Sequence, residues 1–191
     1  MLTKDEFPGF LEQLVDDVAQ RLLGCVLKCE VDGREVKVRI VETESYDEDD
    51  EASHAYGGKR KRNAVMFGPA GHLYVYFTYG MHYCCNVVTG REGYGSGVLI
   101  RAVEPVEGLE LLEERRGMSG VGALNGPAKL TMALGIDGEY NGHDLRLPPI
   151  KLLTGNLKTG EVIASSPRIG ISLAKDIHRR YYISGNPYVS R

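Results

Sequence analysis

The sequence predicts an α+β fold in one domain, built around a mostly antiparallel β-sheet. Segments with the alternating pattern of β-strands are joined by short turns, which favours antiparallel pairing of neighbouring strands. Helical periodicity is confined to a few separate segments and does not follow each strand, as it would in an α/β fold. A length of 191 residues suits one core, so we expect a single domain over residues 1–191.

Composition places the chain among ordinary globular proteins. Hydrophobic residues make up 42% and charged residues 26% of the sequence. No apolar run approaches the roughly 20 residues that a membrane helix needs. The start, Met-Leu-Thr-Lys-Asp-Glu-Phe-Pro, has no basic segment followed by an apolar block, so we expect no secretory signal and no membrane attachment.

Net charge and cysteine spacing bear on two kinds of ligand. The formal net charge of −3 argues against a nucleic-acid ligand, although the basic run Lys59–Arg62 can override it locally. Cys25 and Cys29 are spaced like half of a zinc site, but the adjacent Cys84 and Cys85 would point to opposite faces of a strand. Buried free thiols are the preferred interpretation. No histidine pair has metal-ligand spacing, so we expect no metal site.

An amphipathic helix is predicted near the N-terminus. Apolar residues there recur at three- and four-residue spacing, the period of one helix face. Gly24 can end this helix, because glycine readily adopts the left-handed conformation that follows many helices. The residues of the apolar face are Leu11, Leu14, Val15, Val18, Ala19 and Leu22.

A β-hairpin follows this helix. Its strands, Val26–Val31 and Arg34–Glu44, lie on either side of Asp32-Gly33, a strong two-residue turn signal. Aliphatic residues alternate with basic ones in the second strand. If the alternation continues, Glu42, Glu44 and Tyr46 lie on the core-facing side with the aliphatic residues.

The two glutamates are candidate site residues. An ionised carboxylate that leaves water costs several kcal/mol unless it is paired or functional. One of Glu42 and Glu44 could act as a base while the other supports the structure. The alternative is that both form ion pairs with arginines such as Arg39 or Arg101. Two residues apart on one strand face, they lie about 7 Å from each other and point the same way, which does not suit the two carboxylates of a glycosidase.

A second hairpin is rich in tyrosine. Its strands are His72–Tyr79 and Tyr83–Val88. Strand aromatics usually pack in a core, and we expect this of Tyr74 and Tyr83. Tyr76 and Tyr79 have opposite parity, so at least one is exposed. An exposed aromatic side chain beside the glycine of the hairpin tip could enter a stack of bases, where stacking contributes about 1–3 kcal/mol per base.

The remaining elements are a strand and two helices. The strand Val98–Val103 is predicted to end at Pro105, and Glu107–Arg116 has a helical pattern with Leu109 and Leu112 on one face. Asn125-Gly126-Pro127 is a helix start in which asparagine is the capping candidate. Lys129 lies in the first turn, where free backbone amides can bind a phosphate.

Common enzyme motifs do not occur in the sequence. It contains no Gly-x-Ser-x-Gly, Walker A or Gly-x-Gly-x-x-Gly fingerprint, which argues against nucleophile-elbow hydrolases, P-loop enzymes and Rossmann enzymes. His54 alone is a weak candidate, because a lone histidine is more often structural than catalytic. The residues by themselves therefore predict a strand-end carboxylate near aromatic side chains, with scattered basic residues.

Several segments in register extend this prediction. Arg39–Tyr46 reads Arg-Ile-Val-Glu-Thr-Glu-Ser-Tyr and is followed by Asp50–His54. Together with the segments named below, they resemble the alkyladenine (3-methyladenine) DNA glycosylase family of base-excision repair. The resemblance covers nearly the whole chain after the first helix. The further segments in the family's order are Arg62-Asn63, Met66-Phe67, Leu73–Tyr76, Tyr79–Met81, Asn86, Leu99–Pro105, Gly126–Leu130 and Gly185–Ser190.

The resemblance implies a function and a role for each catalytic residue. The enzyme would flip alkylated or deaminated purines out of duplex DNA and hydrolyse their N-glycosidic bond. Glu44 would be the general base that activates the attacking water, and Arg101 would help to hold that water. Tyr79 would be the wedge that fills the space vacated by the base. Without an identifiable amine nucleophile, the enzyme would be monofunctional and leave an abasic site.

The resemblance also implies a base-binding pocket. Tyr46, His54 and Tyr76 would sandwich the extruded base, and Asn86 would discriminate against the exocyclic amine of normal guanine. Two features depart from the family: the segment between Tyr46 and His54 is one residue shorter than in vertebrate members, and Cys84-Cys85 precedes Asn86. We expect both to affect the range of substrates rather than the reaction.

From the residues and the resemblance together we expect an α+β domain with a curved, mostly antiparallel sheet, flanking helices and a protruding β-hairpin. The partner would be double-stranded DNA with damaged purines. We expect no cofactor, a monomer, and a location in the cytoplasm with the nucleoid in a prokaryote or in the nucleus of a eukaryote. One alternative is a non-catalytic reader of damaged or flipped bases, and another is a nucleoside or sugar hydrolase that acts on small substrates. The expected phosphate contacts are Lys129, Arg62 within the basic run, Arg179 and Arg180.

Overall fold

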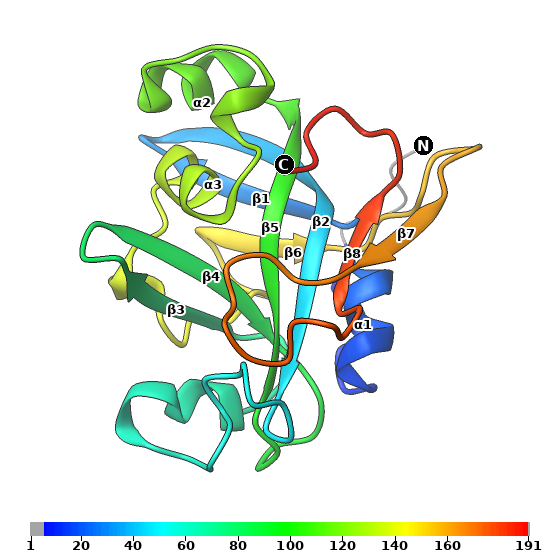
Figure 1. Ribbon diagram of the computed structural model, residues 1–191. Coiled ribbons are helices and arrows are strands. Elements are labelled where there is room, and N and C mark those ends of the chain that lie inside the picture. Colours follow the sequence, from blue (N-terminus) through cyan, green and yellow to red (C-terminus); the bar gives the residue numbers. More distant parts are fainter. Residues whose placement is uncertain (1–5, 191) are drawn as a thin grey trace.

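Strands β2 (Arg34–Asp47) and β5 (Ser96–Glu107) run antiparallel through the centre of the β-sheet (Figure 1). The structure is a computed structural model and describes residues 6–190. The first five residues, on which part of the predicted lack of a secretory signal depends, lie outside this range. Strand order is β3-β4-β5-β2-β1-β6, and β8, which pairs with β7, adds to one part of β2. Every pairing is antiparallel, which confirms the predicted α+β fold with a curved antiparallel sheet.

The other elements are short. The strands are β1 (Val26–Val31), β3 (Leu73–Thr78), β4 (His82–Val88), β6 (Ile150–Leu153), β7 (Ile163–Ser166) and β8 (Arg180–Ile183). The α-helices are α1 (Val15–Arg21), α2 (Leu109–Arg116) and α3 (Pro127–Leu134). The 3₁₀ helices among the described residues are η1 (Lys61–Phe67), η2 (Val121–Ala123) and η3 (Gly138–Tyr140).

Both predicted hairpins are present. Asp32 and Gly33 between β1 and β2 have φ values of 50° and 71°, as a type I′ turn requires. The β3–β4 hairpin projects from one side of the molecule (Figure 1). At its tip, Tyr79 and Gly80 also have positive φ values, of 51° and 69°. For a bulky residue such as Tyr79 this conformation is strained.

Helix α1 is shorter than predicted. It begins at Val15, and Leu14 precedes it as an N-cap residue that is 78% exposed, so the assignment of Leu14 to the apolar face is wrong. Asp16 and Asp17 occupy the first turn, where acidic residues favour a helix start. Gly24 follows the helix with φ +94°, and an added Cβ would lie 2.6 Å from the carbonyl oxygen of Asn156. Glycine is therefore required there.

Strand β5 and helix α2 also differ from the prediction. Pro105 does not end β5, which continues to Glu107. The pairing with β2 shifts register beside Pro105, and such an irregularity tolerates a proline because no ladder hydrogen bond is lost. Helix α2 begins at Leu109 and buries Leu111 and Leu112, whereas Leu109 itself is 38% exposed.

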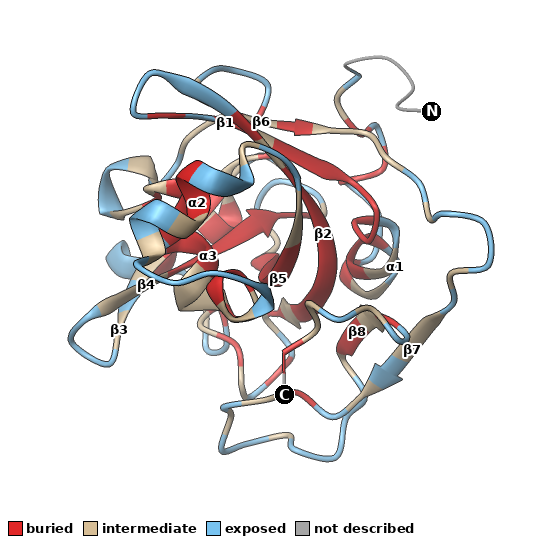
Figure 2. Cartoon of the chain, turned by 90° about the horizontal axis from the view of Figure 1, so that it is seen from above, coloured by how far each residue is buried: buried red, intermediate tan, exposed pale blue. Residues whose placement is uncertain are grey.

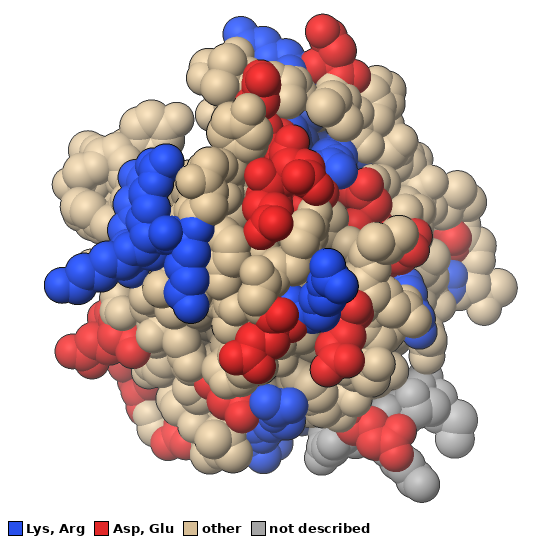
Figure 3. Space-filling view, turned by 90° about the horizontal axis from the view of Figure 1, so that it is seen from below, with Lys and Arg blue, Asp and Glu red and all other residues tan. Residues whose placement is uncertain are grey.

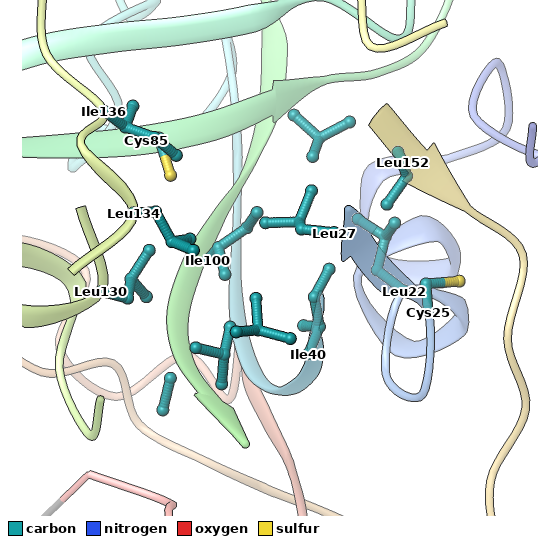
Figure 4. Packing of buried hydrophobic residues seen from close by; sticks show 14 of the residues in the cluster. Leu22, Cys25, Leu27, Ile40, Cys85, Ile100, Leu130, Leu134, Ile136 and Leu152 are labelled. Atoms are coloured by element: carbon teal, nitrogen blue, oxygen red, sulfur yellow. The ribbon is translucent and has the colours of Figure 1, made fainter. Parts of the chain in front are cut away.

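The main core lies between the sheet and helices α1 and α3. Leu22, beside α1, and Leu130, from α3, meet Ile40 and Ile100 of the two central strands (Figure 4). Figure 2 shows the central strands buried and the hairpin tips exposed. A smaller cluster around Met66 packs on another part of the sheet. It is this second region that carries the candidate site.

Candidate active site

Two β-bulges decide which way the glutamates of β2 point. Ile40 pairs with Val103 and Glu42 with Ala102, so Val41 has no partner on β5. The partner of Thr43 is Ile100, so on β5 Arg101 is the unpaired residue, and the two irregularities cancel. Each bulge adds one residue and exchanges the faces of the strand beyond it.

The faces of β2 are therefore reversed after Val41. The Thr43 hydroxyl donates a hydrogen bond of 2.8 Å to the carbonyl of Ala19, and the Ser45 hydroxyl donates to Asp16, both in α1. Thr43 and Ser45 thus face the main core, whereas Glu42, Glu44 and Tyr46 lie on the opposite face. The prediction that the glutamates share the face of the aliphatic residues of β2 is wrong.

A cavity of about 430 Å³ opens on the face opposite the main core. Cross-strand pairs bring its wall together, because Tyr74 pairs with Asn86, Asn86 with Leu99, and Leu99 with Glu44. Residues 169–173, from the segment between β7 and β8, form another part of the wall. In Figure 1 this segment passes in front of the central strands. The predicted site residues that line the cavity are Tyr46, His54, Tyr76, Tyr79, Asn86 and Arg101.

Glu44 lies directly behind this wall and has no exposed surface. Its Oε2 accepts a hydrogen bond of 2.7 Å from the Tyr46 hydroxyl. Its Oε1 accepts one of 2.8 Å from the backbone N–H of Ile169 and lies 3.3 Å from a guanidinium nitrogen of Arg101. All three partners belong to residues of the cavity wall, so Glu44 is both buried and fixed in position.

Glu42 forms a second buried ion pair with Arg101. Its Oε1 accepts hydrogen bonds of 3.2 Å from Arg101 Nε and 2.6 Å from Arg180 Nε. Burial disfavours the charged form of Arg101, but Glu44 and Glu42 raise the pKa of Arg101 above its usual value. The open alternative from the sequence, that the glutamates pair with arginines, therefore applies to both carboxylates.

Arg180 is buried, contrary to the expectation that it contacts phosphate. It is 9% exposed, and its guanidinium also donates to the Ser166 hydroxyl at 2.9 Å and to the Ser190 carbonyl at 2.9 Å. With its donors used inside the protein, it cannot reach a phosphate on the surface. Arg180 lies inside the protein because its positive charge, together with that of Arg101, stabilises the buried Glu42 carboxylate.

Aromatic rings surround the open side of the cavity. The rings of His54 and Tyr76 lie 4.5 Å apart at 69°, and His54 Nδ1 is 3.0 Å from the Tyr74 hydroxyl. Burial, and then the positive charge of Arg62, lower the pKa of His54 below its usual value. The imidazole is therefore neutral at neutral pH. Burial and the Glu44 carboxylate raise the pKa of Tyr46, so its hydroxyl remains a donor.

The sequence did not identify every residue of the site. Tyr74, predicted to be a core residue, is 3% exposed but also lines the cavity and contacts His54. Asn86, 4% exposed, is held by a hydrogen bond of 3.1 Å from its Nδ2 to the Tyr74 carbonyl. The contribution of Ile169 is made by its backbone, for which a sequence carries no signal.

Tyr79 and the predicted phosphate contacts lie at the edges of this site. Tyr79 is 81% exposed at the hairpin tip and also lines the cavity mouth. Exposed basic side chains from Lys59 to Arg62 gather at the end of the molecule where η1 lies (Figure 3). Lys129 donates a hydrogen bond of 2.7 Å to Asn125 Oδ1. Asn125 does not cap α3, whose N-cap is Gly126, so that prediction is wrong.

Arg179 is surrounded by carboxylates. It lies 3.0 Å from Asp47, 3.5 Å from Asp16 and 3.6 Å from Asp50. Partial burial disfavours the charged form of Arg179, but the hydrogen bond to Asp47 and the charges of the three carboxylates raise the pKa of Arg179 above its usual value. A phosphate contact would have to compete with three acidic partners, so Arg62 and Lys129 are the better candidates.

Comparison with known families identifies the family of the chain. A family model described as methylpurine-DNA glycosylase (MPG) matches residues 9–187. The chain belongs to the methylpurine-DNA glycosylase family. This confirms the resemblance seen in the sequence, and it makes the chain a DNA-repair hydrolase of N-glycosyl bonds.

Proteins of several other organisms are similar to this methylpurine-DNA glycosylase over most of its length. A protein of Carboxydothermus hydrogenoformans is 52% identical over 176 residues, which cover 91% of this chain and 92% of the relative. One of Nitrosospira multiformis is 48% identical, with 92% and 88% covered, and one of Methanoculleus marisnigri is 49% identical, with 96% and 97% covered. Each bears the name "Putative 3-methyladenine DNA glycosylase".

Two further findings concern the part of the chain that the structure describes. Among residues 6–190, no helix has both the length and the apolar character needed to cross a membrane. Within the same range, no three histidine, cysteine, aspartate or glutamate side chains are grouped so that they could hold a metal ion.

Proposed function

We propose that this methylpurine-DNA glycosylase flips alkylated or deaminated purines out of duplex DNA and hydrolyses their N-glycosidic bond with a water activated by Glu44. The main support is the position of Glu44: a fully buried carboxylate, held by hydrogen bonds from Tyr46 and Ile169 and by an ion pair with Arg101, behind the wall of an aromatic cavity. The reaction leaves an abasic site and an intact strand.

The cavity suits a flipped purine. A base inside a duplex cannot be reached by an enzyme, so it must leave the stack, which costs a few kcal/mol. Stacking on Tyr46, Tyr76 and His54 offsets part of this cost. The neutral state of His54 matters as well, because an imidazolium would repel a base that alkylation has made cationic.

Glu44 then takes a proton from the attacking water. The water oxygen forms a bond to C1′ of the sugar while the bond between C1′ and the base nitrogen breaks, and the leaving base takes the bonding electrons. A carboxylate at this point also stabilises the positive charge that develops on the sugar. Because Glu44 is closed off by its neighbours, the wall between Tyr46 and Arg101 must open far enough to admit one water.

Residues at the cavity edge bind the DNA. Tyr79 is exposed at the hairpin tip and would fill the space that the flipped base leaves in the duplex. Arg62 is exposed beside the cavity, and Lys129 lies in the first turn of α3, whose Pro127 lines the cavity. Both would contact backbone phosphates, which position a protein on a duplex without reading its sequence.

Single-turnover base release tests the proposal. Duplexes that carry 7-methylguanine or hypoxanthine are incubated with excess protein, and free purine and strand breaks are measured. The proposal expects free purine, with strands that break only after alkali treatment. Tight binding without free purine would favour the non-catalytic reader of damaged bases. Cleavage of free nucleosides, with no salt-dependent affinity for DNA, would favour a nucleoside hydrolase.

A further inference from the structure

A cation lies behind one ring of the cavity wall. The guanidinium carbon of Arg168 is 4.6 Å from the centroid of the Tyr46 ring. The Arg168 side chain is completely buried and does not line the cavity, whereas Tyr46 does. Arg168 therefore covers the ring face that is turned away from the cavity, and a bound base would use the other face.

This arrangement places a positive charge one ring away from the substrate. The face of an aromatic ring attracts a cation because its π-electrons are negative. A cation already bound on one face polarises those electrons toward itself, which weakens the attraction of the other face for a cation. It also repels a second cation directly. Neither effect is well screened, because Arg168 is out of reach of salt and water.

Asp50 neutralises this charge. Its carboxylate accepts two hydrogen bonds from Arg168, one from Nη1 and one of 3.0 Å from Nη2, in a bidentate pair. Asp50 is also fully buried, and its Oδ1 accepts the backbone N–H of Ala52 at 3.0 Å. Burial favours the neutral acid, but the bonds to Arg168 and Ala52 keep the pKa of Asp50 below its usual value. The other charged neighbour, Arg179, is at 3.6 Å.

The substrates of the proposed reaction differ in charge. A purine methylated at N7 or N3 carries a positive charge at slightly acidic pH, whereas hypoxanthine is neutral. An unpaired cation behind Tyr46 would act against the first kind of base and would hardly affect the second.

We propose that Asp50 is a specificity-determining residue: by neutralising Arg168 behind Tyr46, it allows the cavity to accept cationic alkylated purines as well as neutral ones. The inference rests on the proposed function, because it concerns the bases that this cavity processes. Asp50 acts through Arg168 and the tyrosine ring and does not touch the substrate.

The test compares one cationic and one neutral lesion on each protein. Single-turnover rates of base release are measured with 7-methylguanine and hypoxanthine duplexes, at a slightly acidic pH where 7-methylguanine keeps its charge. The variants are Asp50→Asn, which leaves Arg168 unpaired, and Asp50→Asn combined with Arg168→Gln, which removes both charges. Asp49→Asn is the matched control, since Asp49 is exposed on the same loop and accepts a hydrogen bond from the Tyr94 hydroxyl rather than from Arg168. The ratio of the two rates is independent of how much of a preparation is folded.

If Asp50 determines charge selectivity, the ratio of the two rates should change in some variants and not in others. In Asp50→Asn, release of 7-methylguanine relative to hypoxanthine falls on the order of tenfold. The double variant recovers the wild-type ratio within about twofold, and Asp49→Asn keeps it. If Asp50→Asn slows both lesions equally, or if the double variant retains the low ratio, Asp50 has only a structural role and the inference is overturned. Wild-type protein that releases neither base would instead overturn the proposed function, and this inference with it.

Discussion

Glu42 and Ser190 are joined by two hydrogen bonds although 148 positions separate them in the chain. The backbone N–H of Ser190 donates to Glu42 Oε2 at 2.7 Å, and its hydroxyl donates to Oε1 at 2.8 Å. Arg101 donates to the same Oε1. The last described residue of the chain is thus tied to an arginine of the cavity wall.

Ser190→Ala should therefore weaken both the fold and the site. The change removes a buried hydrogen bond to a charged group, which typically costs about 1.5–3 kcal/mol of stability. Base release should also slow, because Arg101 loses part of its support. Urea unfolding and single-turnover rates measure the two effects, with Ser184→Ala, an exposed serine of the same region, as control. Equal stability of the two variants would show that the Ser190 hydroxyl contributes nothing.

Tyr79→Asn should make the protein more stable and less active. The left-handed backbone at Tyr79 costs roughly 1 kcal/mol for a bulky residue and less for asparagine. The ring is exposed, so its loss removes little packing. Without the wedge a flipped base returns to the stack, and release should slow by about tenfold or more. A higher melting temperature with slower release would fit this expectation, whereas unchanged release would remove Tyr79 from base flipping.

Arg62→Ala should reduce the salt dependence of DNA binding. One lost phosphate contact lowers the slope of log affinity against log salt by about one. Arg34→Ala is the control, because Arg34 is exposed on the β1–β2 hairpin and pairs with Glu114. Arg180→Ala should leave the slope unchanged and destabilise the protein, since Arg180 is buried against Glu42. A reduced slope for Arg180→Ala would contradict its internal role.

Alkaline pH should destabilise the protein through its buried thiols. Burial raises the pKa of Cys25 to about 11 and that of Cys29 to about 12. Above about pH 8.5 the unfolded chain loses these protons while the folded protein keeps them, so the free energy of unfolding falls as pH rises. Urea midpoints at neutral pH and near pH 10 check this. In Cys29→Ala the fall should be smaller; an equal fall would assign it to other groups.

The sequence predicted local structure well where a turn has its own chemistry. Asp32-Gly33 and the glycine after Tyr79 both mark hairpins that the structure contains. The sequence also predicted correctly that Glu42, Glu44 and Tyr46 lie on the same side of β2. It did not predict which side, because the bulges at Val41 and Arg101 depend on pairing between distant strands and leave no local signal.

The remaining errors have a similar cause. Arg180 has the appearance of a surface residue, and only the buried Glu42 explains why it lies inside. The pair between Asp50 and Arg168 joins residues 118 positions apart, so neither sequence neighbourhood reveals it. Leu14 fits the helical period but precedes the helix start that Asp16 favours. Local patterns thus locate the strands and candidate residues, while their partners come from tertiary packing.

Glu44→Gln tests the central claim most directly. Glutamine keeps the size of the side chain and one acceptor for the Tyr46 hydroxyl, but it cannot take a proton from water. Glu51→Gln, at the exposed rim of the cavity, is the matched control. We expect Glu44→Gln to bind damaged duplex about as tightly as the wild type while its single-turnover base release falls by about 10²–10⁴-fold. Release at close to the wild-type rate would contradict the assignment of Glu44 as the general base.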